Sequence, residues 1–154
     1  MIKVAIVEGN QTVRQSLETI VNLAPGCRCI GTSGTADEAL QTLRNLQPDV
    51  VLVDTQSPGR RGVELTVRIQ EWLPATRIIA LTVYEDPDRI FRALKAGACG
   101  YLLKRSTPEQ IIAMIHQAHR AEVTQPHAKV TDGKNSPFGE LGKKVSTARL
   151  ASES

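Results

Sequence analysis

The sequence has no long hydrophobic run and few aromatic residues. Although 41% of the 154 residues are hydrophobic, no stretch approaches the ~18 to 20 consecutive apolar residues that a membrane span needs. The chain begins with a strand-like segment, MIKVAIV, where a secretory signal would carry a charged segment and a cleavage site. Phe, Trp and Tyr make up only 3%, so there is no evident platform for stacking single-stranded nucleic acid. We therefore expect a cytoplasmic protein with no membrane partner.

Cysteine is also scarce. Cys27, Cys29 and Cys99 form an odd set without the four-ligand spacing of a zinc site, which predicts reduced, structural thiols. Cys27 and Cys29 lie two residues apart in a predicted strand and share one face, so a soft-metal or redox pair is the alternative.

Charge is nearly balanced along the chain. The formal net charge is +3, with 14 basic and 12 acidic residues in 1–120 and 5 against 4 in 121–154. Neither part has the basic surplus of a nucleic-acid-binding domain.

Apolar runs of strand length alternate with segments of helical period. Strands are predicted at 2–7, 27–33, 49–53, 76–82 and 98–103, and helices after Asn10, at 36–46, 62–73, 86–96 and after Thr107. Thr35 with Glu38, and Thr107 with Gln110, are typical of capping boxes, and Gly97 suits a left-handed helix end. This alternation predicts an α/β fold, a doubly wound five-stranded parallel sheet with helices on both faces.

The periodicity ends near residue 120. Residues 1–120 are predicted to form one domain, and 121–154 a polar, turn-rich linker or tail with a short helix at 138–149.

Four polar residues stand at the predicted strand ends. Glu8 follows the first strand, Asp54 the third, and Lys104 the fifth, while Thr82 ends the fourth. In an open parallel sheet the ligand crevice lies at the carboxyl ends of the strands, so these side chains should converge.

This set has a narrow chemistry. A carboxylate can act as a nucleophile toward phosphorus, and acid oxygens can hold Mg²⁺. Lys104 would neutralise phosphoryl oxygens and the Thr82 hydroxyl would hydrogen-bond one of them. Asp54 is thus the candidate phosphoryl acceptor, the alternative being an Asx turn that only caps its loop.

Four ordered blocks resemble a known family: IVEGNQTVRQSL, PDVVLVDTQSPGRRGVEL, RIIALT and FRALKAGACGYLLK. They resemble the receiver domains of two-component response regulators, and AGACGYLLK is particularly similar to the NarL/FixJ (LuxR-type) subfamily. The resemblance implies a flavodoxin-like, CheY-like fold with strand order 2-1-3-4-5. It also implies that Asp54 is the phosphorylated aspartate, Thr82 the switch hydroxyl, Lys104 the site lysine and Tyr101 the aromatic switch.

The resemblance assigns a metal site that is incomplete here. Glu8 matches the first acid of the Mg²⁺ pair and the Gln56 backbone carbonyl matches a third ligand, but Gly9 stands where the family usually has the second acid. We therefore expect weak Mg²⁺ binding. Gln56 and Tyr84 match positions that tune dephosphorylation. Arg60 and Arg61 add positive charge beside the acceptor.

The function implied is that of a response regulator. A sensor histidine kinase would phosphorylate Asp54, and the domain would change conformation to control an output, by family likeness transcription. Such a domain is no enzyme beyond assisting its own phosphorylation and dephosphorylation. A homodimer would form through the fourth helix, fifth strand and fifth helix, or through the first and fifth helices. DNA would be bound only by an output domain, which we do not find within the 154 residues.

Two alternatives stay open. Gly9 motivates a phosphorylation-independent pseudo-receiver that acts as a protein-interaction module. A flavodoxin-like enzyme would use the EGNQT turn to hold a flavin phosphate, but one glycine and one threonine are too little for a phosphate loop.

Overall fold

The computed structural model describes residues 1–55, 61–83 and 85–121, with the side chain of Arg61 excluded. The predicted tail, including its short helix at 138–149, lies outside these residues. Gln56, Arg60 and Tyr84 also lie outside them. The domain boundary near residue 120 therefore stays a prediction.

Strands and helices alternate strictly, as the sequence predicts. The strands are β1 (Ile2–Val7), β2 (Cys27–Ser33), β3 (Val50–Asp54), β4 (Arg77–Thr82) and β5 (Gly100–Leu103). The helices are α1 (Gln11–Leu23), α2 (Ala36–Leu46), α3 (Arg61–Trp72), α4 (Pro87–Ala96) and α5 (Pro108–Arg120).

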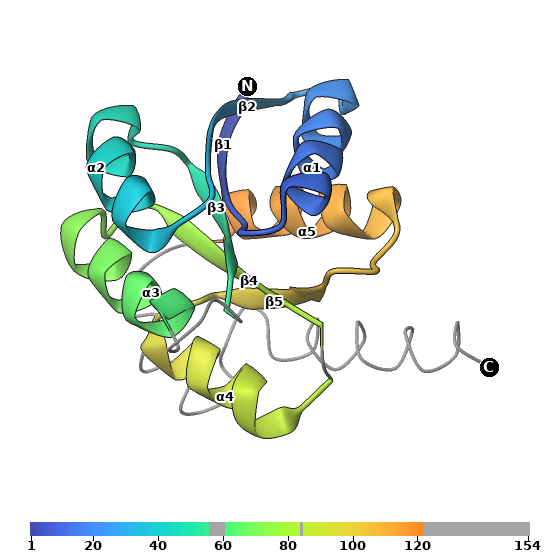
Figure 1. Cartoon of the computed structure of the whole chain (residues 1–154). Helices are drawn as coiled ribbons and strands as arrows, with labels where there is room; N and C mark the ends of the chain where they lie inside the picture. The colour runs from blue at the N-terminus through green and yellow to red at the C-terminus, as the bar shows by residue number, and fades with distance from the viewer. Residues whose placement is uncertain (56–60, 84, 122–154) are drawn as a thin grey trace.

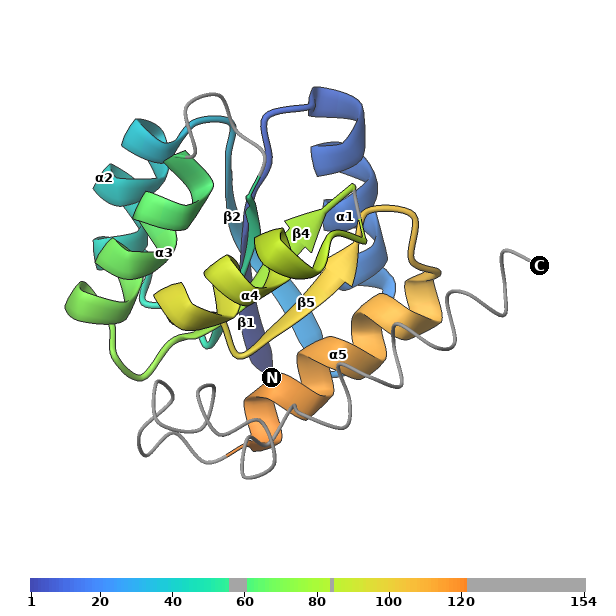
Figure 2. The same cartoon turned by 90° about the horizontal axis from the view of Figure 1, so that it is seen from below.

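The five strands form one parallel sheet in the order β2-β1-β3-β4-β5. Helices α1 and α5 cover one face, and α2, α3 and α4 cover the other (Figures 1 and 2). The predicted α/β class, strand order and two-sided helix layers are all confirmed. Because every strand runs the same way, all carboxyl ends lie at one edge of the sheet.

Each face of the sheet has its own hydrophobic core. Alternate strand residues point to opposite faces, so neighbours such as Val51 and Leu52 enter different cores. One core joins the sheet to α1 and α5 through residues such as Leu17 and Ile115, and the other joins it to α2, α3 and α4 through residues such as Leu43 and Ile69. Burial on both faces explains why the central strands are continuous apolar runs.

Local signals place the helix ends. The side chains of Asn10 and Thr35 accept hydrogen bonds from the third backbone N–H after each cap, at Val13 and Glu38. Thr107 and Gln110 form the complete capping box that the sequence predicts for α5. The predicted end of α4 is also confirmed, since Gly97 has φ +125° and ends the helix.

Gly62 lets the start of α3 pack directly on the end of β3. A Cβ atom there would lie 2.2 Å from the Asp54 carbonyl oxygen and 2.6 Å from Thr55 Cα. Both neighbours are backbone atoms, which cannot move aside as a flexible side chain can. The glycine therefore helps to set the position of Asp54.

We predict that Gly62→Ala destabilises the domain by about 1 to 3 kcal/mol, because the added methyl group must push α3 off the sheet. Urea unfolding followed by circular dichroism measures this. Gly9→Ala is the matched control, since a Cβ at Gly9 would meet only the Gly34 carbonyl oxygen, at an ordinary 3.6 Å. Equal stability of the two variants would contradict the packing argument.

Candidate functional site

The side chain of Lys104 lies between two acids, Glu8 and Asp54. Glu8 follows β1, and Asp54 ends the neighbouring strand β3. Its Nζ atom is 2.9 Å from Glu8 Oε1, 3.0 Å from Glu8 Oε2 and 3.2 Å from Asp54 Oδ2. Three of the residues predicted from strand ends are thus brought together. We call Glu8, Asp54 and Lys104 the ion triad.

The ion triad is largely shielded from water. The side chains of Glu8 and Asp54 are 1% and 7% exposed, and that of Lys104 is 17% exposed. Glu8 Oε2 also accepts a hydrogen bond from the backbone N–H of Asn10 at 3.0 Å, whereas among the described residues Oε1 has only its ion-pair contact with Lys104. Low exposure makes each of these charges interact more strongly than it would on the surface.

Thr82, the predicted hydroxyl, is joined to the ion triad through the backbone. It ends β4, is 3% exposed, and its carbonyl oxygen accepts a hydrogen bond from the Lys104 N–H at 2.9 Å. On the other side of β4, the N–H and hydroxyl of Thr55 both donate to the Leu81 carbonyl at 3.0 Å. These bonds fix the residues around Asp54 and Lys104 to β4.

Tyr101, the predicted aromatic switch, is buried inside the domain. It is 5% exposed and belongs to the core that also contains Ala80 and Ala93, on the α4 side of the sheet. By strand alternation, Thr82 points toward the same side. The structure therefore places the two predicted switch residues over the same layer, facing α4.

The predicted metal site is only partly described. Gln56, its backbone-carbonyl ligand, lies outside the described residues, and so do the tuning residue Tyr84 and Arg60. Gly9 is exposed and has room for a side chain, because a Cβ would meet only the Gly34 carbonyl at 3.6 Å. In the described part of the chain, no three His, Cys, Asp or Glu side chains gather where they could hold a metal ion.

Arg14 also belongs to this region, which its position in the sequence does not reveal. Its Nη1 atom donates to the backbone carbonyl of Glu8 at 2.8 Å and would lie 3.0 Å from a Cβ added at Gly34. The signal in the sequence was weak, an arginine in the first turns of the helix that follows the Glu8–Gly9 turn. Only the packing of that helix shows that the guanidinium is at the site.

The cysteines are free thiols. Burial raises the pKa of Cys27 and of Cys29, and it raises the pKa of Cys99 to about 12. Cys27 Sγ is 3.8 Å from His116 Nε2. Protonated, packed thiols are poor nucleophiles and metal ligands, which favours the structural role that the sequence predicts.

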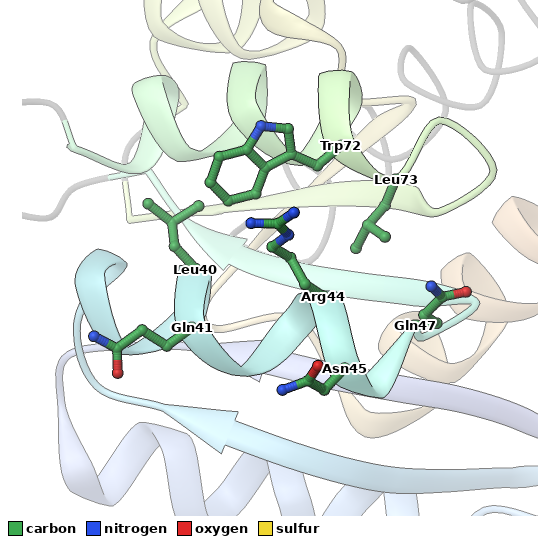
Figure 3. Close-up of a pocket in the computed structure, with 7 residues that line it drawn as sticks. All are labelled: Leu40, Gln41, Arg44, Asn45, Gln47, Trp72 and Leu73. Carbon is green, nitrogen blue, oxygen red and sulfur yellow. The ribbon is translucent and has the colours of Figure 1, made fainter.

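A pocket of about 850 Å³ lies between α2 and α3, away from the ion triad (Figure 3). The guanidinium of Arg44 stacks on the ring of Trp72, 4.8 Å from its centroid. The lining residues come from the later turns of both helices, which run antiparallel to the strands and so end at the opposite edge of the sheet. The pocket contains no carboxylate and no nucleophile among its lining residues: Leu40, Gln41, Arg44, Asn45, Gln47, Trp72 and Leu73.

Among the described residues, no helix combines the length and apolar character required to cross a bilayer.

Comparison with curated proteins finds transcriptional regulators. The chain is 33% identical over 121 residues to the uncharacterized transcriptional regulatory protein YxjL of Bacillus subtilis and 33% identical over 121 residues to the oxygen regulatory protein NreC of Staphylococcus carnosus. These alignments cover 79% and 78% of this chain and 56% of each relative. The nitrate/nitrite response regulator NarL of Escherichia coli is 27% identical, over 81% of this chain and 58% of its own. The chain therefore spans a little over half the length of these relatives.

Solved structures share the fold. The receiver domain of the putative response regulator NarL from Mycobacterium tuberculosis superposes with a TM-score of 0.74 at 23% identity, covering 79% of this chain and 98% of its own. A LuxR-family response regulator from Aurantimonas has a TM-score of 0.69 at 27% identity, covering 87% and 98%.

The family comparison agrees with the observed fold. The model of the response regulator receiver domain matches residues 4–116, from within β1 to within α5. The chain belongs to the response regulator receiver domain family.

Proposed function

We propose that this domain accepts a phosphoryl group on Asp54 and changes conformation in response. The observation that supports it most is the contact between Lys104 Nζ and Asp54 Oδ2 at 3.2 Å, in a largely buried site at the carboxyl edge of the sheet. An ammonium held at a carboxylate is well placed to balance the charge that arrives with a phosphoryl group.

The transfer itself needs one nucleophile and one leaving group. A carboxylate oxygen of Asp54 forms a new bond to phosphorus, and the bond from phosphorus to the donor breaks, its electron pair leaving with the donor. With acetyl phosphate the leaving group is acetate. With a phosphohistidine of a sensor kinase it is the imidazole nitrogen, which takes up a proton.

Lys104 and Thr82 assist by charge and by position. The Lys104 ammonium would turn toward the phosphoryl oxygens, and the Thr82 hydroxyl would donate to one of them. Tyr101 lies on the α4 side of the sheet with Thr82, so movement of Thr82 would repack the α4 surface. The output of the domain is then a change in that surface.

The residues present offer Mg²⁺ a poor site. The cation prefers several oxygen ligands, yet among the described residues Glu8 and Asp54 supply the carboxylates there and Gly9 contributes none. Both oxygens of Glu8 already contact Lys104. We propose that any Mg²⁺ is held weakly by Glu8, Asp54 and the Gln56 carbonyl, where it would neutralise phosphoryl charge.

The proposed partner of Asp54 is a sensor histidine kinase. A homodimer would form through α4, β5 and α5, where the ring of Phe91 is exposed, or through α1 and α5, where the side chain of Leu23 is exposed. By likeness to the transcriptional relatives, the controlled output is transcription, with DNA bound by a separate output domain. The matching family is a receiver and not a catalytic one, and the comparisons do not support the pseudo-receiver alternative.

We predict that acetyl phosphate adds one phosphate to the chain and that Asp54→Asn abolishes it, because an amide cannot displace the leaving group. Intact-mass analysis measures the product. Asp49→Asn is the control. The Asp49 carboxylate accepts a hydrogen bond from the Lys3 N–H at the opposite edge of the sheet, so this variant should be labelled like the wild type. Labelling of Asp54→Asn equal to that of the wild type would refute the assignment.

We predict that Gly9→Asp tightens Mg²⁺ binding at least about tenfold, because a third carboxylate adds a charge within a few ångström of the cation. Isothermal titration calorimetry measures it. Gly9→Asn, which has the same shape without the charge, should change the affinity much less. If the wild type and Gly9→Asp bind Mg²⁺ equally, Gly9 does not limit the site.

A further inference from the structure

If Asp54 is phosphorylated as proposed, Glu8 loses its counter-ion when Lys104 turns to the phosphoryl group. Lys104 contacts both carboxylate oxygens of Glu8, and the same ammonium is required at the phosphoryl oxygens. The Glu8 side chain is 1% exposed, so water cannot replace Lys104 there. A buried carboxylate that loses its counter-ion is strongly destabilised. A second cation at Glu8 would remove this cost when Lys104 turns away, and Mg²⁺ has few ligands at this site.

Arg14 is the nearest candidate among the described residues. Its Nη1 atom already donates to the backbone carbonyl of Glu8 at 2.8 Å. A guanidinium has five N–H donors, and within the described part of the chain the structure gives that of Arg14 one hydrogen bond. The side chain is half-buried, and its planar group can bind a carboxylate through two parallel bonds.

Arg14 lies close to Gly9, the position at which the family usually has its second acid. The guanidinium lies against the Glu8–Gly9 peptide, no more than about 6 Å from Gly9 Cα by standard peptide geometry. An acid at Gly9 would attract this guanidinium and compete with Glu8 for it. With glycine there, Glu8 is the carboxylate left for Arg14 on that turn.

The charges of the four side chains cancel. Glu8 and Asp54 carry two negative charges, and Lys104 and Arg14 carry two positive ones. A neutral group of fixed charges gives a divalent cation little electrostatic reason to bind, in contrast to an acid-rich site. The chemistry of the site therefore disagrees with the metal requirement that the family resemblance implies.

We propose that Arg14 replaces the divalent cation in this receiver. When Lys104 turns from Glu8 to the phosphoryl oxygens, Arg14 pairs with the Glu8 carboxylate and keeps it neutralised. Asp54 then accepts a phosphoryl group from a small donor or a kinase without bound Mg²⁺. This inference rests on the proposed phosphorylation of Asp54.

The test compares the initial rate of labelling by acetyl phosphate in Mg²⁺ and in EDTA, by intact mass. For the wild type the two rates should agree within about threefold, since the fixed cations supply the charge. For Arg14→Gln the ratio should rise to about tenfold, because Mg²⁺ would then have to supply the charge that replaces Lys104 at Glu8. Arg14→Lys keeps the charge and should stay close to the wild type. Calorimetry should show tighter Mg²⁺ binding in Arg14→Gln than in the wild type.

Arg28→Gln is the matched control, an exposed arginine at the amino end of β2, and should leave the ratio unchanged. Circular dichroism verifies that each variant is folded. The role of Arg14 is overturned if the wild type is labelled only in Mg²⁺. It is also overturned if Arg14→Gln has the same ratio of labelling rates in Mg²⁺ and EDTA as the wild type. Both results leave Asp54 as the acceptor. No labelling of the wild type in either condition overturns the proposed function and this inference with it.

Discussion

A single ammonium group holds the site together. Lys104 contacts Glu8 and Asp54 with three nitrogen-to-oxygen distances of 2.9 to 3.2 Å, although it is 96 residues from Glu8 in the sequence. Two carboxylates this well buried would repel each other without a cation between them. The arrangement of the Glu8 and Asp54 side chains at the carboxyl edge therefore depends on this cation.

The fold makes that contact available. Parallel strands bring their carboxyl ends to one edge, and the order β2-β1-β3-β4-β5 makes β1 and β3 direct neighbours. Gly62 allows α3 to pack on the end of β3, and the Lys104 N–H bond to the Thr82 carbonyl joins the hydroxyl and the lysine. Under the proposed function, a phosphoryl group on Asp54 would act on the α4 surface through Thr82 and Tyr101, which lie over the same face of the sheet.

Much of this could be predicted from sequence because the signals are local or periodic. Continuous apolar strands, the caps at Asn10 and Thr107 and the polar strand ends all follow from short segments, and they fix the element order and the edge of the site. The role of Arg14 could not be predicted in this way. It depends on how α1 packs over the Glu8–Gly9 turn, which no sequence period encodes, and the two-oxygen contact of Lys104 with Glu8 likewise requires coordinates.

The most direct test of the ion triad is a double-mutant cycle between Glu8 and Lys104, with Glu8→Gln, Lys104→Met and the double variant unfolded in urea. Lys104→Met leaves the buried Glu8 carboxylate without its cation, whereas in the double variant neither side chain of this pair is charged. We expect a coupling free energy of about 1 to 3 kcal/mol. The double variant should therefore lose less unfolding free energy than the two single variants lose together. Strictly additive losses, within about 0.3 kcal/mol, would show that Lys104 does not hold Glu8 and would contradict the account.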